Sequence, residues 1–156
     1  MIFNSNDDLT KELYVTVQEA DSYCSLRLDT TSWLDYSDDA KQKAIYMATE
    51  RIDRLKYRGC KSGTNLEFPR NGDTVIPIAI KKACCLIAFQ LLDGRDIELE
   101  IETNRVVSEG HSAARATYDP GFALEHITAG IPSYEAWSLL KPYLIDPRAL
   151  TISRVG

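Results

Sequence analysis

The sequence lacks the features that mark membrane-spanning, secreted and zinc-binding proteins. It has no apolar run near the roughly 20 residues that cross a bilayer, and residues 1–10 lack the order of basic, apolar and small residues found in a signal peptide. Its four cysteines include no Cys-x-x-Cys pair, which favours buried reduced thiols over a disulfide or a zinc site. We therefore expect a soluble protein that is made inside the cell and has no membrane partner.

The usual catalytic signatures are missing as well. The chain has no glycine-rich phosphate loop, no His-Glu-x-x-His zinc motif and no calcium-binding EF-hand loop. His111 and His126 are its only histidines, and both stand in turn-like contexts that favour an ordinary surface role over general-base catalysis. The residues do not build the convergent pocket of a small hydrolase or a metal enzyme, so we expect no catalysis and no cofactor.

The size and net charge of the chain limit the classes of protein that remain possible. The 156 residues suit one domain, and 44% hydrophobic with 26% charged residues is typical of a globular chain. The 18 Lys and Arg residues are outnumbered by 23 Asp and Glu residues, which gives a net charge of −5. This sign disfavours a protein whose main affinity comes from non-specific contacts with phosphates.

Four segments carry the start signals of α-helices. Thr16 and Glu19 form a capping-box pattern, and Ser37 precedes two aspartates that favour the positive end of a helix dipole. Pro77 presets a first helical turn, and Ser133 opens the last pattern. Apolar residues follow each start at steps of three and four. We predict a mainly α fold, a three- to four-helix bundle that carries a short β arm or hairpin and an extended C-terminal tail.

The β arm is predicted at about residues 95–121. Apolar residues at 97, 99 and 101 alternate with Glu98, Glu100 and Glu102, the pattern of a strand with one buried face, although a helix is the alternative. Three aligned carboxylates could hold a divalent cation, but a solvated acidic face is favoured. The arm belongs to a helical domain over residues 1–144. Residues 145–156 have few means of making a core and form a docking tail.

A basic patch stands out at residues 51–61. Cations near the C-terminal end of a helix complement its dipole and need no ligand, which is the favoured interpretation of the patch taken alone. The functional alternative is a contact with phosphates or with an acidic partner surface. In a ring of identical subunits, the basic residues of one copy would meet the acidic residues of the next. The predicted inter-subunit residues are Arg51, Arg54 and Arg58 on one side and Glu98, Glu100 and Glu102 on the other.

An ordered set of short motifs resembles a known phage family. The motifs are YVTVQEADSY at 14–23, Trp33, AIYMATERID at 44–53, Gly59, LEFPR at 66–70 and Ile76-Pro77. In order and spacing they resemble the family catalogued as "putative DnaT-like single-stranded DNA binding protein", whose members look like head–tail connector subunits of tailed bacteriophages. The resemblance covers Tyr14 to about Leu92 and, more weakly, residues 139–144.

The resemblance implies a virion structural protein, a head–tail connector or adaptor. Its subunits would form a ring, expected to be a dodecamer, that attaches to the portal protein and joins it to a downstream tail or tail-completion protein. Double-stranded DNA would pass through the ring without sequence-specific binding. The protein would be made in the host cytoplasm and would lie at the head–tail interface of the virion. The residues assigned to the portal contact are Pro147, Arg148, Leu150, Ile152 and Arg154.

The alternative function is that of a replication-type protein that binds single-stranded DNA. Such a protein needs a basic groove and, for base stacking, exposed aromatic side chains along it. Only Tyr57 stands among cations in the sequence, whereas Trp33 and Trp137 lie in apolar helical patterns and are expected in the core.

Overall fold

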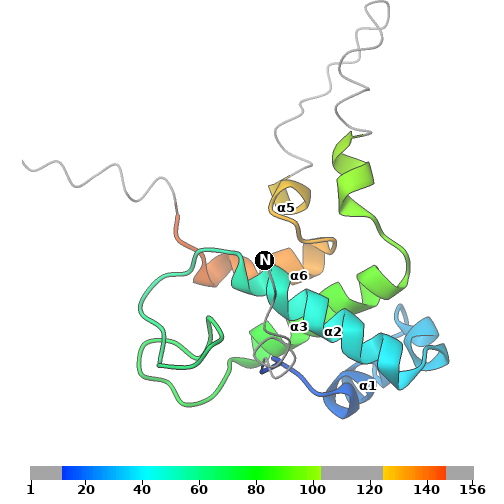
Figure 1. Cartoon of the computed structure of the whole chain (residues 1–156), viewed down its shortest axis with the longest axis horizontal. Helices are drawn as coiled ribbons and strands as arrows, with labels where there is room; N and C mark the ends of the chain where they lie inside the picture. The colour runs from blue at the N-terminus through cyan, green and yellow to red at the C-terminus, as the bar shows by residue number, and fades with distance from the viewer. Residues whose placement is uncertain (1–11, 103–124, 147–156) are drawn as a thin grey trace, which may run out of the picture.

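A computed structural model describes residues 12–102 and 125–146, and these residues form a set of packed helices (Figure 1). A further helical stretch at residues 97–102 follows α3. The elements in chain order are α1 (Val17–Ser25), the 3-10 helix η1 (Thr31–Asp35), α2 (Asp38–Asp53), α3 (Ile78–Leu92), α5 (Glu125–Thr128), α6 (Tyr134–Leu140) and the 3-10 helix η2 (Lys141–Tyr143).

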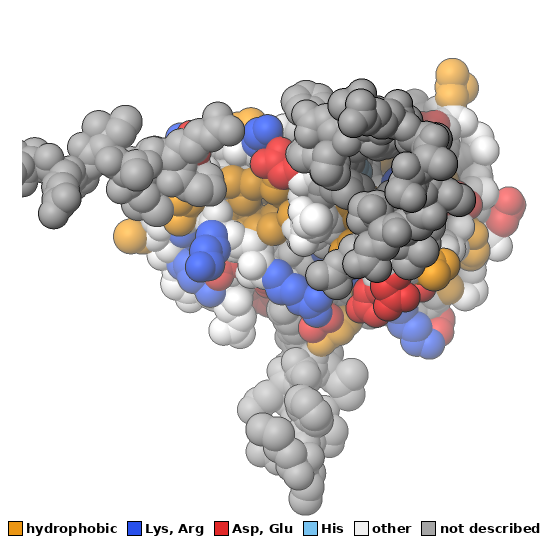
Figure 2. Space-filling view, turned by 90° about the horizontal axis from the view of Figure 1, so that it is seen from above, with side chains coloured by type: hydrophobic (Ala, Val, Ile, Leu, Met, Phe, Trp, Pro, Cys, Tyr) orange, Lys and Arg blue, Asp and Glu red, His pale blue; other side chains and the backbone are white. Residues whose placement is uncertain are grey.

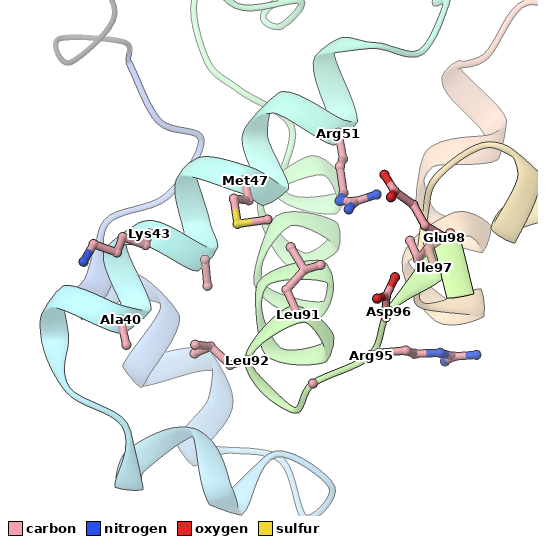
Figure 3. Close-up of a pocket in the computed structure, with 12 residues that line it drawn as sticks. Ala40, Lys43, Met47, Arg51, Leu91, Leu92, Arg95, Asp96, Ile97 and Glu98 are labelled. Atoms are coloured by element: carbon pink, nitrogen blue, oxygen red, sulfur yellow. The ribbon is translucent and has the colours of Figure 1, made fainter. Parts of the chain in front are cut away.

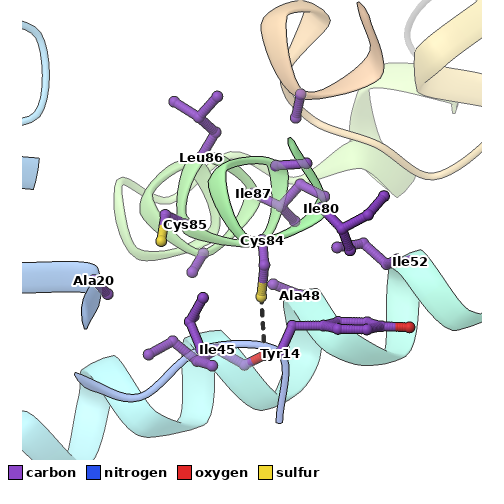
Figure 4. Close-up of a cluster of buried hydrophobic side chains, with 14 of the residues drawn as sticks. Tyr14, Ala20, Ile45, Ala48, Ile52, Ile80, Cys84, Cys85, Leu86 and Ile87 are labelled. Atoms are coloured by element: carbon purple, nitrogen blue, oxygen red, sulfur yellow. Dashed lines mark hydrogen bonds between the residues drawn. The ribbon is translucent and has the colours of Figure 1, made fainter. Parts of the chain in front are cut away.

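The centre of the fold is α3, which packs against α2 on one side and α6 on another (Figure 1). Its residues 83–89 are buried in succession, because the helix is apolar around most of its circumference. Cys84 lies over α2, with its Sγ 4.0 Å from the carbonyl oxygen of Ile45 (Figure 4). Ala44 and Ala48 of α2 are buried there, and their small side chains allow the two helices to approach closely.

The N-terminal helix begins with the expected capping box. The Glu19 backbone N–H donates to Thr16 Oγ1 at 3.2 Å, and the Thr16 N–H donates to the Glu19 carboxylate at 2.9 Å. Trp33 of η1 is fully buried beneath α1, and its indole N–H donates to Asp21 at 2.7 Å. The predicted core role of Trp33 is therefore confirmed.

The loop between α2 and α3 is ordered by one buried cation, Arg70. Its guanidinium donates to the backbone carbonyl oxygens of Tyr57, Arg58 and Gly59 and pairs with the Glu67 carboxylate at 2.7 Å. The side chains of Leu66 and Phe68, together with Pro69, are buried beside it, and the Phe68–Pro69 peptide bond is cis. The predicted packing of the LEFPR motif onto the helices is confirmed.

The prediction of a mainly α bundle is confirmed, with its helices starting where the sequence signals placed them. The prediction of a strand at 97–101 is wrong, because residues 97–102 are helical. Ile97 is buried whereas Leu99 is 59% exposed, so these two alternate apolar residues do not share a face. Within the described ranges, residues pair in β fashion only at the isolated bridges Tyr57–Leu144 and Lys61–Arg70.

The predicted cysteine burial is right at three of the four positions. Cys24, Cys84 and Cys85 are buried free thiols, whereas Cys60 is exposed in the loop. Burial raises the pKa of the Cys84 thiol to about 12, which keeps it protonated at neutral pH.

Some of the expectations from the sequence cannot be compared with the structure. The remainder of the predicted arm and the docking tail, residues 103–121 and 147–156, lie outside the described residues. The domain boundary at residue 144 stays a prediction. None of the helices in the described ranges has both the length and the apolar character needed to cross a membrane.

Candidate functional site

The end of α2 and the residues after it carry cations that lack carboxylate partners. Elsewhere in the described ranges, Lys and Arg side chains mostly form ion pairs with carboxylates; the paired cations are Arg27, Lys41, Lys43, Lys61, Arg70, Lys81, Arg95 and Lys141. The remaining described cations, with no such pair, are Lys82 on α3 and a group that we call the basic segment: Arg51, Arg54, Lys56 and Arg58.

Backbone carbonyl oxygens fix two members of the basic segment. Arg58 donates to the carbonyl oxygens of Leu144 at 2.8 Å and Pro142 at 2.9 Å, and its own N–H donates to the Tyr143 carbonyl oxygen. Arg51 donates to the carbonyl oxygen of Gly130 at 2.9 Å. These bonds position the guanidinium groups without neutralising their charge, so both remain available to an anion.

Two members of the segment, Arg54 and Lys56, have exposed side chains, and among the described residues neither forms an ion pair. Arg54 lies near Arg51, and burial together with the charge of Arg54 lowers the pKa of the Arg51 guanidinium from its usual value. Neighbouring like charges that form no direct ion pair favour an anionic ligand, because a ligand would relieve their repulsion.

Aromatic side chains near the basic segment are held inside the fold. Tyr57 is buried, donates to the Ile52 carbonyl oxygen at 2.7 Å and packs edge-on against Phe68. Tyr143 is half-buried on the same ring cluster. Trp137 is buried as expected. In the described part of the chain, therefore, the basic segment presents cations without an exposed aromatic ring on which a base could stack.

A groove of about 510 Å³ adjoins the basic segment between α2 and the end of α3 (Figure 3). We call it the α2–α3 groove. Met47, Leu91 and Leu92 make its apolar surface, and Met47 is 45% exposed to solvent. Arg51 lines the groove as well, and so joins it to the basic segment.

The opposite side of the α2–α3 groove, which we call its acidic side, carries two carboxylates together with Arg95, whose charge is paired with Glu100. Asp96 and Glu98 line it, and Figure 3 shows the side chains of Arg51 and Glu98 pointing toward one another. Both carboxylates lie close enough to favour the charged form of Arg51 and so oppose the lowering of its pKa. Asp96 also begins the helical residues 97–102, because its carboxylate accepts the Leu99 N–H at 3.2 Å.

The structure separates the acidic residues that the sequence had grouped. Glu98 lines the groove, Glu100 pairs with Arg95 at 2.7 Å, and Glu102 is exposed on the same short helix. On a helix, Glu98 and Glu102 lie four residues apart on one face while Glu100 points to another side, so the three carboxylates do not share one face. In residues 12–102 and 125–146, no three His, Cys, Asp or Glu side chains gather as metal ligands would.

The predicted inter-subunit contact is not tested by contacts within one chain. Arg51 and Glu98 lie on opposite sides of one groove in the same molecule, while Arg54 and Arg58 are exposed. Pairing between copies stays a prediction. The expected portal-binding residues, Pro147, Arg148, Leu150, Ile152 and Arg154, lie outside the described residues.

The surface view shows how the charges are distributed. On the face drawn in Figure 2, separate groups of Lys and Arg side chains lie around a hydrophobic area, with Asp and Glu side chains beside them. Such a mixture is expected where most described cations form ion pairs with carboxylates.

Sequence reasoning located the basic segment but missed the groove. Lys43, Met47 and Arg51 are spaced by four residues, which places them along one stripe of α2. The signal that could have found the groove is Met47, an apolar residue between two cations on that stripe. Its partners Leu91 and Leu92 come from another helix, so spacing alone could not identify them.

A comparison with family models decides which family this fold belongs to. The model described as "Putative DnaT-like ssDNA binding protein" matches residues 5–150, nearly the whole chain. The chain belongs to this DnaT-like family. No curated protein and no solved structure matches it.

Membership of the DnaT-like family corrects the main functional expectation. The expected role of head–tail connector or adaptor, with its virion-structural and genome-packaging character, is wrong: the matching family is described by single-stranded DNA binding. That description agrees with the alternative drawn from the sequence. The partners and the virion location that the connector role implied stay predictions.

Proposed function

We propose that this DnaT-like protein binds single-stranded DNA through the basic segment. The observation that carries the proposal is the concentration of unpaired cations: Arg51, Arg54, Lys56 and Arg58 have no carboxylate partners, whereas most other described cations do. The family description supports the same class of ligand.

The basic segment suits the backbone of a flexible strand. Arg51 and Arg58 are fixed by carbonyl oxygens, so they offer phosphates a preset position. Arg54 and Lys56 are exposed between them and can follow a strand of variable shape. Contacts of this kind release counterions from the nucleic acid and carry no sequence preference by themselves.

The dipole of α2 explains the cations at the end of that helix but not the cations that follow it. Arg51 stands in the last turn of α2 and Arg54 caps that helix, so both complement its negative end. Lys56 and Arg58 lie beyond the helix, where the effect of the dipole has faded. Arg58 is held by the carbonyl oxygens of Leu144 and Pro142, whereas Lys56 has no such partner and is better accounted for by a ligand than by the dipole.

Charge reversal tests the proposal with a control of equal charge. Binding of a fluorescent single-stranded oligonucleotide at low ionic strength should weaken roughly tenfold in Arg54→Glu and in Lys56→Glu, because each change removes an attraction and adds a repulsion. Lys82→Glu is the matched control, since Lys82 is exposed and unpaired on α3. Lys82→Glu changes the net charge by the same amount as Arg54→Glu and Lys56→Glu.

The outcomes separate a site from a general charge effect. A loss confined to Arg54→Glu and Lys56→Glu supports the basic segment. An equal loss in Lys82→Glu would mean that net charge alone sets the affinity. Absence of binding by the wild-type protein at low ionic strength would exclude the function.

A further inference from the structure

We propose that the α2–α3 groove holds a base of the bound strand and favours bases that carry an exocyclic amino group. The inference rests on the proposed function, because the strand reaches the groove from the basic segment. It adds a base-reading site to a surface that otherwise contacts only phosphates.

The position of Arg51 connects the two sites. Arg51 belongs to the basic segment and also lines the groove (Figure 3). Among the described residues, the only hydrogen bond of its side chain goes to the Gly130 carbonyl oxygen, which leaves other N–H groups of the guanidinium for a ligand. A phosphate held between Arg51 and Arg54 would place the adjoining base at the mouth of the groove.

The apolar surface of the groove suits the flat face of a base. Met47 is 45% exposed, and Leu91 and Leu92 are half-buried beside it. A methionine thioether is polarizable and adapts to an aromatic ring, with a favourable contact between sulfur and ring. The groove therefore offers the base contact that the buried Tyr57 and half-buried Tyr143 do not.

The acidic side of the groove selects the edge of the base. Glu98 and Asp96 present carboxylate oxygens, which accept hydrogen bonds and repel phosphates. The amino group of cytosine donates to a carboxylate, whereas uracil has a carbonyl oxygen at the same ring position. This charge complementarity, cations toward phosphates and carboxylates toward amino groups, orients a nucleotide in one direction across the groove.

The test compares strands that differ at that ring position. Fluorescence anisotropy at neutral pH would measure binding of oligodeoxycytidine, oligodeoxyuridine and an abasic strand, each of roughly ten nucleotides, the scale of a single-strand site. We expect the cytosine strand to bind at least about fivefold more tightly than the uracil strand. The abasic strand should bind more weakly than either.

Two pairs of variants assign the preference to the groove. Glu98→Gln should reduce the preference for cytosine, while Glu102→Gln, on the same short helix but outside the groove, should leave it intact. Met47→Ala should weaken binding of both base-carrying strands by about threefold without affecting the abasic strand. Gln42→Ala, an exposed change on another face of α2, is its control.

The outcomes distinguish the inference from the proposed function. Equal binding of all three strands, with sensitivity to Arg54→Glu retained, would overturn the base site and leave the phosphate surface standing. Failure of every strand to bind would overturn both. A change in the native mass of the protein in Met47→Ala, with unchanged DNA binding, would assign the groove to a second copy of the chain.

Discussion

Gly59 shows how a single residue holds the loop that follows the basic segment. Its backbone has a φ of +78°, a conformation that residues with a side chain seldom adopt. A Cβ atom there would lie 1.8 Å from Oδ1 of Asn71, the same oxygen that accepts the Cys60 N–H at 3.2 Å. Any other residue at this position would be strained and would displace the Asn71 side chain.

We therefore expect Gly59→Ala to lower the free energy of unfolding by about 1–3 kcal/mol from backbone strain alone, and by more as Asn71 is displaced. Gly63→Ala is the matched control, because Gly63 has a φ of +88° but no atom within 4 Å of the added Cβ. Denaturant unfolding would compare the two variants. Equal losses would show that the contact with Asn71 contributes nothing.

Arg70 is the second residue on which the loop depends, and it shows why a cation near the site need not be a ligand. Its guanidinium is buried and its donors are used by Glu67 and by carbonyl oxygens of residues 57–59. Basic residues in this sequence thus have two different functions. Exposure and bonding partners, which the sequence does not contain, distinguish Arg70 from Lys56.

At the scale of elements, α1 is attached to α3 through the residue that also caps it. Glu19 pairs with Lys81 of α3 at 2.8 Å and accepts the Thr16 N–H. The hydrogen bonds from Lys81 and Thr16 lower the pKa of the Glu19 carboxyl below its ordinary value of 4.5. The charged carboxylate is therefore the form that stabilises the fold.

The lowered pKa of Glu19 determines how the free energy of unfolding changes with pH. Because the folded-state pKa is the lower one, the stabilisation is fully present above pH 4.5 and is lost as the pH falls through the folded pKa. Glu19→Gln keeps a capping side chain but cannot titrate, so its unfolding free energy should fall less between neutral and acid pH. Glu19 is largely exposed, which limits the effect to about 0.2–1 kcal/mol.

Thermal unfolding followed by circular dichroism at neutral and acid pH would measure the difference. Glu102→Gln, which removes an exposed glutamate elsewhere, should retain the acid dependence of the wild type. If Glu19→Gln loses stability on acidification as steeply as the wild type, other carboxyl groups carry the effect.

The helices show what the sequence could predict. Thr16, Ser37 and Ser133 each accept a backbone N–H at the start of a helix, and these are local interactions that the residue types specify. The sequence could not decide between strand and helix for residues 97–102, because six residues are too few to distinguish the apolar repeat of a strand from that of a helix. Asp96 as a cap and the Arg95–Glu100 pair favour the helix.

The α2–α3 groove depends on how two helices cross, and for that reason it was beyond the sequence. Met47 could be placed on the stripe of α2 that carries Arg51, but its neighbours Leu91 and Leu92 could not. The same limit applied to the basic segment. Its four cations were visible, whereas their lack of carboxylate partners required the fold.

At the scale of the whole molecule, a net charge of −5 makes binding depend on where the cations stand. Ion pairs neutralise many carboxylates on the described surface, and the carboxylates in excess oppose a polyanion. Among the described residues, attraction is therefore concentrated in the basic segment, with Lys82 as the one other unpaired cation. Local binding of this kind should be weak in absolute terms and steeply sensitive to salt.

The salt dependence can be given a number. If Arg51, Arg54, Lys56 and Arg58 each meet one phosphate, four contacts at about 0.7 counterions each give a slope of log K against log salt near −3 for a single strand. Lys56→Gln should reduce the magnitude of this slope by about 0.7, and Lys82→Gln should leave it unchanged. Anisotropy titrations over a series of salt concentrations would measure both. A wild-type slope near zero would mean that phosphates are not what the basic segment contacts, because only ionic contacts release counterions in proportion to their number.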